Sequence, residues 1–188
     1  NNKLQLTAKR IKALDEDIFP YLKKPDIDID SLIKKFNQML DRVTDPALGK
    51  LLEVVFTPEV RQQFYEATAA KKVHHNYPGG LLEHTVQVAE LCLHAAPSYP
   101  LLNTDLLITG AILHDIGKLD EYQTKIVTEY TVEGKLLGHI IMGVERIGAA
   151  ISEVRSQGQG FSQELEWMIK HMILSHHGTT EFGSPVVP

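Results

Sequence analysis

The sequence feature that most constrains the fold is AILHDIGKLDEY, residues 111–122, where a histidine and an aspartate stand side by side after an apolar stretch. Apolar residues 106–108, preceded by the capping residue Thr104, predict a helix that runs into His114 and Asp115. Ionisable side chains at the end of an apolar helix need partners, because an unpaired charge is costly to bury. The pair is therefore either a satisfied helix end or the centre of a reaction site.

Most of the chain is predicted to be helical. Asp45-Pro46 and Thr57-Pro58 each place a capping residue before a proline that suits the first helical position. Apolar spacing, caps and glycines predict helices at about 32–43, 46–55, 58–70, 80–96, 104–115, 136–156 and, capped by Ser162, 163–177. β-Branched residues and tyrosine at 125–135 indicate one short β-hairpin with its turn at Glu133-Gly134. The expected fold class is all-α.

Length and composition bound the class of protein. The chain has 188 residues, of which 43% are hydrophobic, and this suits one globular domain with a small appendage. We expect a helical extension or linker at residues 1–57 and a helical domain at residues 58–188. No stretch is long and apolar enough to span a membrane, so we expect no membrane partner. The single cysteine, Cys92, excludes an internal disulfide framework and favours a reducing, cytoplasmic location.

Charge is unevenly distributed along the chain. The net charge is −5: residues 1–75 carry 13 basic and 11 acidic side chains, whereas residues 76–188 carry 6 basic and 13 acidic ones. Because nucleic-acid-binding surfaces cluster lysine and arginine, the second part is not a simple surface of that kind. If its substrate is a phosphate ester, metal ions are the obvious source of positive charge.

Five of the nine histidines lie on, or at the end of, the later predicted helices: His84, His114, His139, His176 and His177. Such side chains can converge at the centre of a helical bundle, where bundle proteins build metal sites. Together with Asp115 they offer imidazole and carboxylate ligands, which suit iron, manganese or zinc. A carboxylate can bridge two metals through its two oxygens. This set therefore has more ligands than one ion needs and a suitable number for two.

These residues carry a resemblance to a known family. His84, followed by His114-Asp115 on a later helix, resembles the signature of the HD-domain metal-dependent phosphohydrolase superfamily. His139 and His176-His177 resemble the additional histidines of its two-metal members. Four blocks between residues 77 and 185, YPGGLLEHT, HDIGK, LLGHIIMG and ILSHHGTTEFGSP, are similar to those of the YhaM-type 3′-to-5′ exoribonucleases.

The resemblance implies an all-helical HD-domain bundle that binds two divalent ions. The first ion would be bound by His84, His114 and Asp115, and the second by Asp115, His139, His176 and His177. Manganese is the first expectation, with iron, cobalt or zinc as alternatives. The family pattern also includes a later aspartate that completes the first site and an oligonucleotide-binding barrel before the HD domain. We expect this chain to lack both, so that its HD domain is incomplete at the C-terminal end.

The predicted catalytic residues are Asp115, His114 and Lys118. Lys118 either contacts a substrate phosphate as a point charge or faces solvent at a helix end. His74 and His75 precede the Gly79-Gly80 turn, and we expect them to contact substrate or to assist proton transfer. Glu83 either orients a metal ligand or is an exposed acid in a first helical turn.

The leading functional hypothesis is a metal-dependent phosphodiesterase, a 3′-to-5′ exoribonuclease that hydrolyses single-stranded RNA, and DNA as a further substrate, with metal-activated water. One alternative keeps the centre but acts on small nucleotides, cyclic or linear. Another is a catalytically silent HD module that serves as a scaffold or nucleotide sensor. No oligomeric state is predicted.

Overall fold

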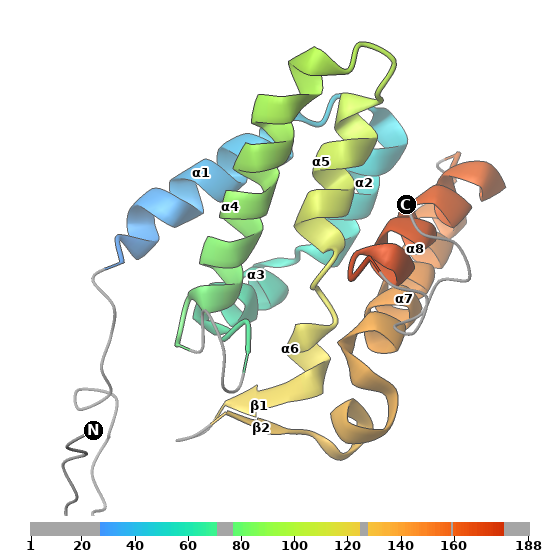
Figure 1. Cartoon of the computed structure of the whole chain (residues 1–188). Helices are drawn as coiled ribbons and strands as arrows, with labels where there is room; N and C mark the ends of the chain where they lie inside the picture. Colours follow the sequence, from blue (N-terminus) through green and yellow to red (C-terminus); the bar gives the residue numbers. More distant parts are fainter. Residues whose placement is uncertain (1–26, 71–76, 125–127, 159, 179–188) are drawn as a thin grey trace, which may run out of the picture.

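Helices make up most of the structure, a computed structural model that describes residues 27–70, 77–124, 128–158 and 160–178. They are α1 (Ile29–Arg42), α2 (Pro46–Val55), α3 (Pro58–Glu66), α4 (Gly80–Ala95), α5 (Thr104–Leu113), α6 (Lys118–Glu121), α7 (Val132–Ser156) and α8 (Gln163–Ser175), with a 3₁₀ turn, η2 (Ala96–Ser98), after α4. Figure 1 shows α4 and α5 side by side, with α8 on the other side of α5. The all-α prediction is confirmed. No helix in the described ranges is both long enough and apolar enough to cross a membrane.

Side-chain caps fix where several helices begin. The predicted caps Asp45, Thr57 and Ser162 each accept a backbone N–H from the first turn of α2, α3 and α8, respectively. α5 begins differently. Asn103, rather than Thr104, is its cap, because the Asn103 side-chain oxygen accepts a backbone N–H from the first turn at 3.0 Å.

α5 is the central helix of the structure. Its residues 108–113 are all buried, and it contacts α1, α2, α4 and α8. A helix that is covered on several sides has no face exposed to solvent for polar residues, which explains its almost wholly apolar sequence. α1 and α2 contribute Phe36, Leu48 and Leu51 to the same hydrophobic core. The helices before and after residue 57 therefore share one core, and the division of the chain at that residue stays a prediction.

A two-stranded hairpin follows α6. β1 (Tyr122–Thr124) pairs antiparallel with β2 (Thr128–Tyr130). A hairpin therefore exists near the predicted place, but the expected turn at Glu133-Gly134 was wrong, since both residues lie in the first turn of α7. Thr131 caps that helix by accepting the Gly134 N–H at 2.8 Å. A Cβ on Gly134 would lie 2.3 Å from the Glu121 carbonyl oxygen, so the glycine serves close packing rather than a turn.

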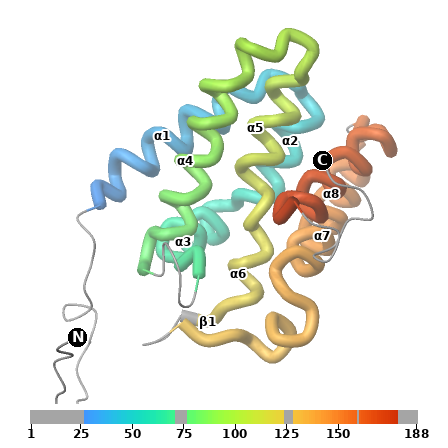
Figure 2. Tube along the Cα trace, in the orientation of Figure 1, coloured from blue at the N-terminus to red at the C-terminus, as the bar shows by residue number. Residues whose placement is uncertain are grey.

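Close backbone approaches bring the first part of α7 next to the turn that follows α5. Figure 2 traces the chain from α5 through α6 and the hairpin into α7, which packs back against α6. α7 is interrupted at Gly138, where φ is +73° and ψ is 160°, a conformation that favours glycine. A Cβ on Gly117 would lie 2.0 Å from the carbonyl oxygen of His139 and 2.5 Å from the backbone nitrogen of Gly143. A glycine at position 117 therefore lets α7 carry His139 close to the HD pair.

Candidate metal centre

The HD pair lies where the central helix ends. His114 is the C-cap of α5, and Asp115 begins the turn that leads to α6. Both side chains are buried, and Asp115 is only 3% exposed. Nδ1 of His114 donates to the carbonyl oxygen of Ala111 at 2.8 Å, so the histidine is held within the last turn of the helix. The aspartate is left as a buried carboxylate that needs cationic or hydrogen-bonding partners.

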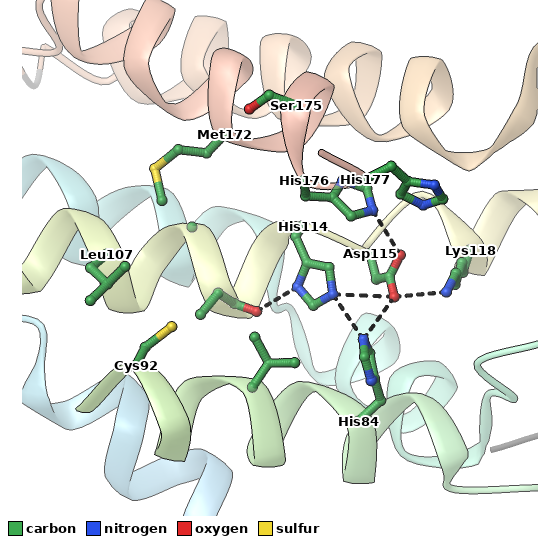
Figure 3. Close-up of a pocket in the computed structure, with 13 residues that line it drawn as sticks. His84, Cys92, Leu107, His114, Asp115, Lys118, Met172, Ser175, His176 and His177 are labelled. Atoms are coloured by element: carbon green, nitrogen blue, oxygen red, sulfur yellow. Dashed lines mark hydrogen bonds and ion pairs between the residues drawn. The ribbon is translucent and has the colours of Figure 1, made fainter. Parts of the chain in front are cut away.

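One oxygen of Asp115, Oδ2, faces residues of α4, α5 and α6. It lies 3.3 Å from His84 Nε2, 3.2 Å from His114 Nε2 and 2.7 Å from Lys118 Nζ. Figure 3 shows these side chains converging on the carboxylate. His84, His114 and Asp115 form a first group that could hold a metal ion, because one ligand atom from each lies within 4.8 Å of the others.

The other oxygen of Asp115, Oδ1, faces residues of α7 and the end of α8. It lies 3.5 Å from His139 Nε2 and 3.6 Å from His176 Nε2. The ring of His177 lies beside both, with centroid distances of 5.3 Å to His139 and 4.4 Å to His176. These three histidines form the second group that could hold a metal ion. The structure thus brings together the six residues named as metal ligands and sets the carboxylate between the two groups.

Hydrogen bonds on the far side of the rings determine which nitrogen faces Asp115. Nδ1 of His114 and Nδ1 of His176 each lie within hydrogen-bond distance of a backbone carbonyl oxygen, at 2.8 and 2.7 Å. Because a carbonyl oxygen only accepts, Nδ1 carries the proton, and Nε2 of the neutral ring keeps its lone pair. Nε2 lone pairs that point at a carboxylate repel it unless a cation lies between them.

Within the six predicted metal ligands, three buried atoms have no hydrogen-bond partner among the described residues: Asp115 Oδ1, His139 Nε2 and His176 Nε2. Buried polar atoms are nearly always paired. All three atoms can offer a lone pair to a cation, and the two nitrogens face the same oxygen. The donor set therefore fits the divalent ions that the sequence resemblance implies, and its imidazoles and carboxylate suit manganese, iron or zinc.

The charge states at the centre also suit metal binding. Burial raises the pKa of Asp115, but its interactions with His114, His84 and the Lys118 ammonium outweigh this effect and hold the pKa well below its usual range. Burial lowers the pKa of His176 to about 4, and it lowers the pKa of His177 as well. At neutral pH the carboxylate is therefore charged and these two rings are neutral, as metal ligands must be.

Glu121 is a buried residue of the centre that sequence reasoning missed. Its Oε1 accepts the backbone N–H of His139 at 3.0 Å and lies 3.3 Å from His139 Nδ1. The non-helical backbone at Gly138 precedes this amide and frees it from the helical hydrogen-bond pattern. Burial raises the pKa of Glu121, but the bonds from His139 outweigh this effect and leave the pKa below its ordinary value. The only sequence signal was an acidic residue shortly after the HD pair, and that pattern also describes a solvated acid.

Of the remaining predicted site residues, Lys118 and Glu83 lie in the described part of the chain, and His74 and His75 lie outside it. The Lys118 side chain is 14% exposed and pairs with Asp115, so the solvent-facing alternative was wrong. A contact between Lys118 and a substrate phosphate stays a prediction. Glu83 is half-buried and accepts a hydrogen bond from the Tyr77 hydroxyl, so the exposed-acid alternative was also wrong. The predicted substrate-contacting residues His74 and His75 lie outside the described residues.

A cavity of about 550 Å³ extends from the centre between α4, α5 and α8. Lys118 and residues of both ligand groups line one end: His84, His114, Asp115, Lys118, His176 and His177. Apolar residues line the other end (Figure 3). This volume is in the range of pockets that bind small molecules, and it would also accept one unit of a polymer.

Comparison with known protein families explains this arrangement. Residues 81–183 match the HD domain family, a range that covers more than half of the chain and contains every residue of the two ligand groups. No solved structure matches the chain. The HD domain implies metal-dependent phosphohydrolase activity, and two ligand groups that share one buried carboxylate fit such a centre. The chain belongs to the HD domain family.

Proposed function

We propose that the protein is a metal-dependent phosphodiesterase that removes nucleotides from the 3′ end of single-stranded RNA, and of DNA as a further substrate. Two divalent ions, manganese in the first place, are its proposed cofactors. The observation that carries the proposal is the orientation of Asp115. Its Oδ2 lies 3.2–3.3 Å from Nε2 of His84 and His114, and its Oδ1 lies 3.5–3.6 Å from Nε2 of His139 and His176. One carboxylate shared by two histidine groups is an arrangement suited to a two-metal hydrolase.

The proposed reaction is hydrolysis of the bond between phosphorus and O3′. The oxygen of water bonds to phosphorus, O3′ leaves with a proton, and a nucleoside 5′-monophosphate is released. When bound, divalent ions supply a hydroxide near neutral pH and offset the charge on the phosphoryl oxygens. Asp115, buried and ionised, holds the negative charge that such ions require. Lys118 lines the cavity 2.7 Å from Asp115 Oδ2, where its ammonium can contact a phosphate oxygen.

RNA is proposed as the substrate because the four blocks between residues 77 and 185 resemble those of the YhaM-type exoribonucleases and occur in the same order. In this proposal His74 and His75, which precede the first block, contact the RNA. The proposed site of action is the cytoplasm, since the one cysteine of the chain suits a reducing compartment.

The proposal is tested with single-stranded RNA labelled at its 5′ end and, separately, at its 3′ end, in the presence of Mn²⁺. We expect 5′-labelled strands to shorten stepwise and 3′-labelled strands to release a labelled mononucleotide at once. Asp115→Asn should abolish both, whereas Asp41→Asn, at an exposed position of α1, should leave both unchanged. Shortening from the 5′ end alone, or no shortening by metal-loaded protein, would contradict the proposal.

A second candidate function, supported by the charge distribution, is hydrolysis of small nucleotides at the same centre. Residues 76–188 carry 13 acidic and only 6 basic side chains, which is unfavourable for gripping a long polyanion. The 550 Å³ cavity has the size of a small-molecule pocket. A panel of mononucleotides and cyclic nucleotides decides between the candidates. Turnover of these compounds without any shortening of RNA would establish the second one.

A further inference from the structure

The cavity beside the metal centre has two chemically unlike ends. The polar end consists of the histidines, Asp115 and Lys118. The other end, which we name the apolar arm, is lined by Val88, Cys92, Leu107, Gly110, Ala111 and Met172. Figure 3 shows Cys92, Leu107 and Met172 together on one side of the cavity, with the HD pair and Lys118 on the other. No charged side chain is found among the described residues that line the apolar arm.

Helical spacing joins three of the metal ligands to the apolar arm. Residues three or four apart lie on one face of a helix, so His84, Val88 and Cys92 follow one another along α4. On α5, Leu107 and Ala111 precede His114 in the same way, and on α8 Met172 precedes His176. At a rise of 1.5 Å per residue, the arm reaches about 12 Å along α4 from His84 to Cys92.

The side chains of the apolar arm keep part of their surface uncovered. Val88, Cys92, Leu107 and Met172 are only half-buried, whereas their neighbours Val86 and Ala89 on α4 are completely buried in the core. Met172 is held over Gly110, where a Cβ would lie 1.9 Å from the Met172 methyl carbon. The glycine therefore lets the thioether lie in the wall of the arm. Ser175, the remaining polar residue of the cavity, donates its hydroxyl to the His171 carbonyl oxygen at 2.6 Å.

We infer that the apolar arm binds the base of a nucleotide whose phosphate lies at the metal centre. This inference rests on the proposed function and names the part of the substrate that the centre itself does not hold. The polar end takes the anionic phosphate, so whatever enters the arm is attached to that phosphate and is uncharged. An aromatic base fits these conditions, and the Met172 sulfur can contact its edge. Because the arm offers aliphatic surface and no charged or unengaged polar group among its described residues, it accepts any base without selecting one.

Cys92 makes the inference testable on the unmodified protein, because it is the single cysteine of the chain and lines the arm. The rate of labelling by a maleimide is measured with Mn²⁺ present, in the presence of adenosine 5′-monophosphate or of ribose 5-phosphate. We expect the mononucleotide to slow labelling about fivefold or more and ribose 5-phosphate to change it less than about twofold, since only the first carries an aromatic base that can cover the thiol. Equal protection by both compounds, or no protection by either, overturns the inference.

A second experiment changes the two partners separately: a substitution fills the apolar arm of the protein, and an abasic unit removes the base from the 3′ end of the RNA. Val88→Phe places a ring in the arm, and its matched control Leu91→Phe adds the same ring at a 69% exposed position of α4 outside the cavity. Wild type and control should shorten RNA about tenfold more efficiently, through KM, when the 3′-terminal unit carries a base than when it is abasic. Val88→Phe should lose this difference and keep its bound manganese.

The two proposals can fail separately in these experiments. Shortening of RNA that is indifferent to the terminal base overturns the inference and leaves the proposed function standing. Protection of Cys92 by the mononucleotide without any shortening of RNA supports the inference and overturns the proposed function. The labelling result does not depend on whether Val88→Phe folds.

Discussion

The carboxylate of Glu121 is predicted to set the affinity of the second ligand group for metal. Its Oε1 accepts the His139 backbone N–H at 3.0 Å and lies 3.3 Å from His139 Nδ1. With Nδ1 as the donor, the ring presents Nε2 to Asp115 Oδ1, 3.5 Å away. Removing such a supporting group costs about 10- to 100-fold in metal affinity, or about 1.4 to 2.8 kcal/mol. Glu121→Gln keeps an acceptor but loses the charge, so the lower value is expected, and Glu121→Ala should reach the higher one.

The assay is calorimetric titration of metal-free protein with Mn²⁺, together with a metal count on the purified protein. We expect the affinity of one of two ions to fall while the other ion, held by His84 and His114, keeps its affinity. Asp120→Asn is the matched control, because the neighbouring carboxylate pairs with Arg146 at 2.7 and 2.8 Å and belongs to neither ligand group. It should bind manganese as the wild type does.

The result that would refute this reasoning is a Glu121→Ala protein that binds its second Mn²⁺ with wild-type affinity. A purely structural role for Glu121 is distinguished by the unfolding of the metal-free protein. If Glu121→Gln loses metal affinity only in proportion to lost folded protein, the carboxylate stabilises the fold and does not position His139. Loss of affinity with unchanged unfolding supports the positioning role.

Three further predictions follow from the same contacts. Asp115→Asn should lower the metal content of both groups, whereas His177→Asn should lower only that of the second, as measured by elemental analysis after Mn²⁺ loading; equal losses would contradict the shared carboxylate. Glu166 has a lowered pKa, because of its bonds to Lys170 and Arg155 at 2.7 Å or less, so its stabilisation is present above its ordinary pKa and is lost as pH falls through the folded value. Glu166→Gln should therefore reduce the free energy of unfolding by about 1 kcal/mol at pH 7 and by progressively less in acid, and a pH-independent loss in denaturant titrations would refute this. Gly134→Ala should destabilise the protein by about 1–3 kcal/mol, because its Cβ would lie 2.3 Å from the Glu121 carbonyl oxygen. Gly148→Ala meets only the flexible end of the Lys170 side chain and should stabilise the protein by up to about 1 kcal/mol. Thermal melts in which both substitutions shift the melting temperature in the same direction would contradict the packing argument.

The helices could be predicted from the sequence wherever local chemistry decides their ends. Asp45, Thr57 and Ser162 cap helices in the structure because the side chain of each accepts a backbone N–H from the first turn that follows it. The start of α7 could not be predicted in this way. Glu133-Gly134 has the composition of a turn, but Thr131 supplies a cap and Gly134 packs against the backbone of Glu121. That contact joins residues 13 positions apart and has no local signature.

The residues of the centre were predictable by type, and their supporting contacts were not. Several histidines and an aspartate on separate helices indicate a metal site, because such side chains can converge at the centre of a helical bundle. Glu121 could not be recognised from the sequence, since its role in positioning His139 depends on its burial and on the break in α7 at Gly138, which presents the His139 backbone N–H to its carboxylate. Lys118 shows the same limit. Its position at a helix end predicts exposure, and only the buried charge of Asp115 keeps it inside.

The two interpretations of the HD pair, a satisfied helix end and a reaction centre, apply to the same arrangement of side chains. The last carbonyls of a helix lack helical partners. His114 follows α5 and His176 follows α8, and each directs Nδ1 at the carbonyl oxygen three residues earlier, at 2.8 and 2.7 Å. The same bond satisfies the helix end and forces the lone pair of Nε2 toward Asp115. Both helices also bring the negative ends of their dipoles to this point, which favours a cation there. The helix termini therefore supply ligand orientation and electrostatic attraction together, so a histidine that directly follows α5 or α8 already presents Nε2 for metal binding.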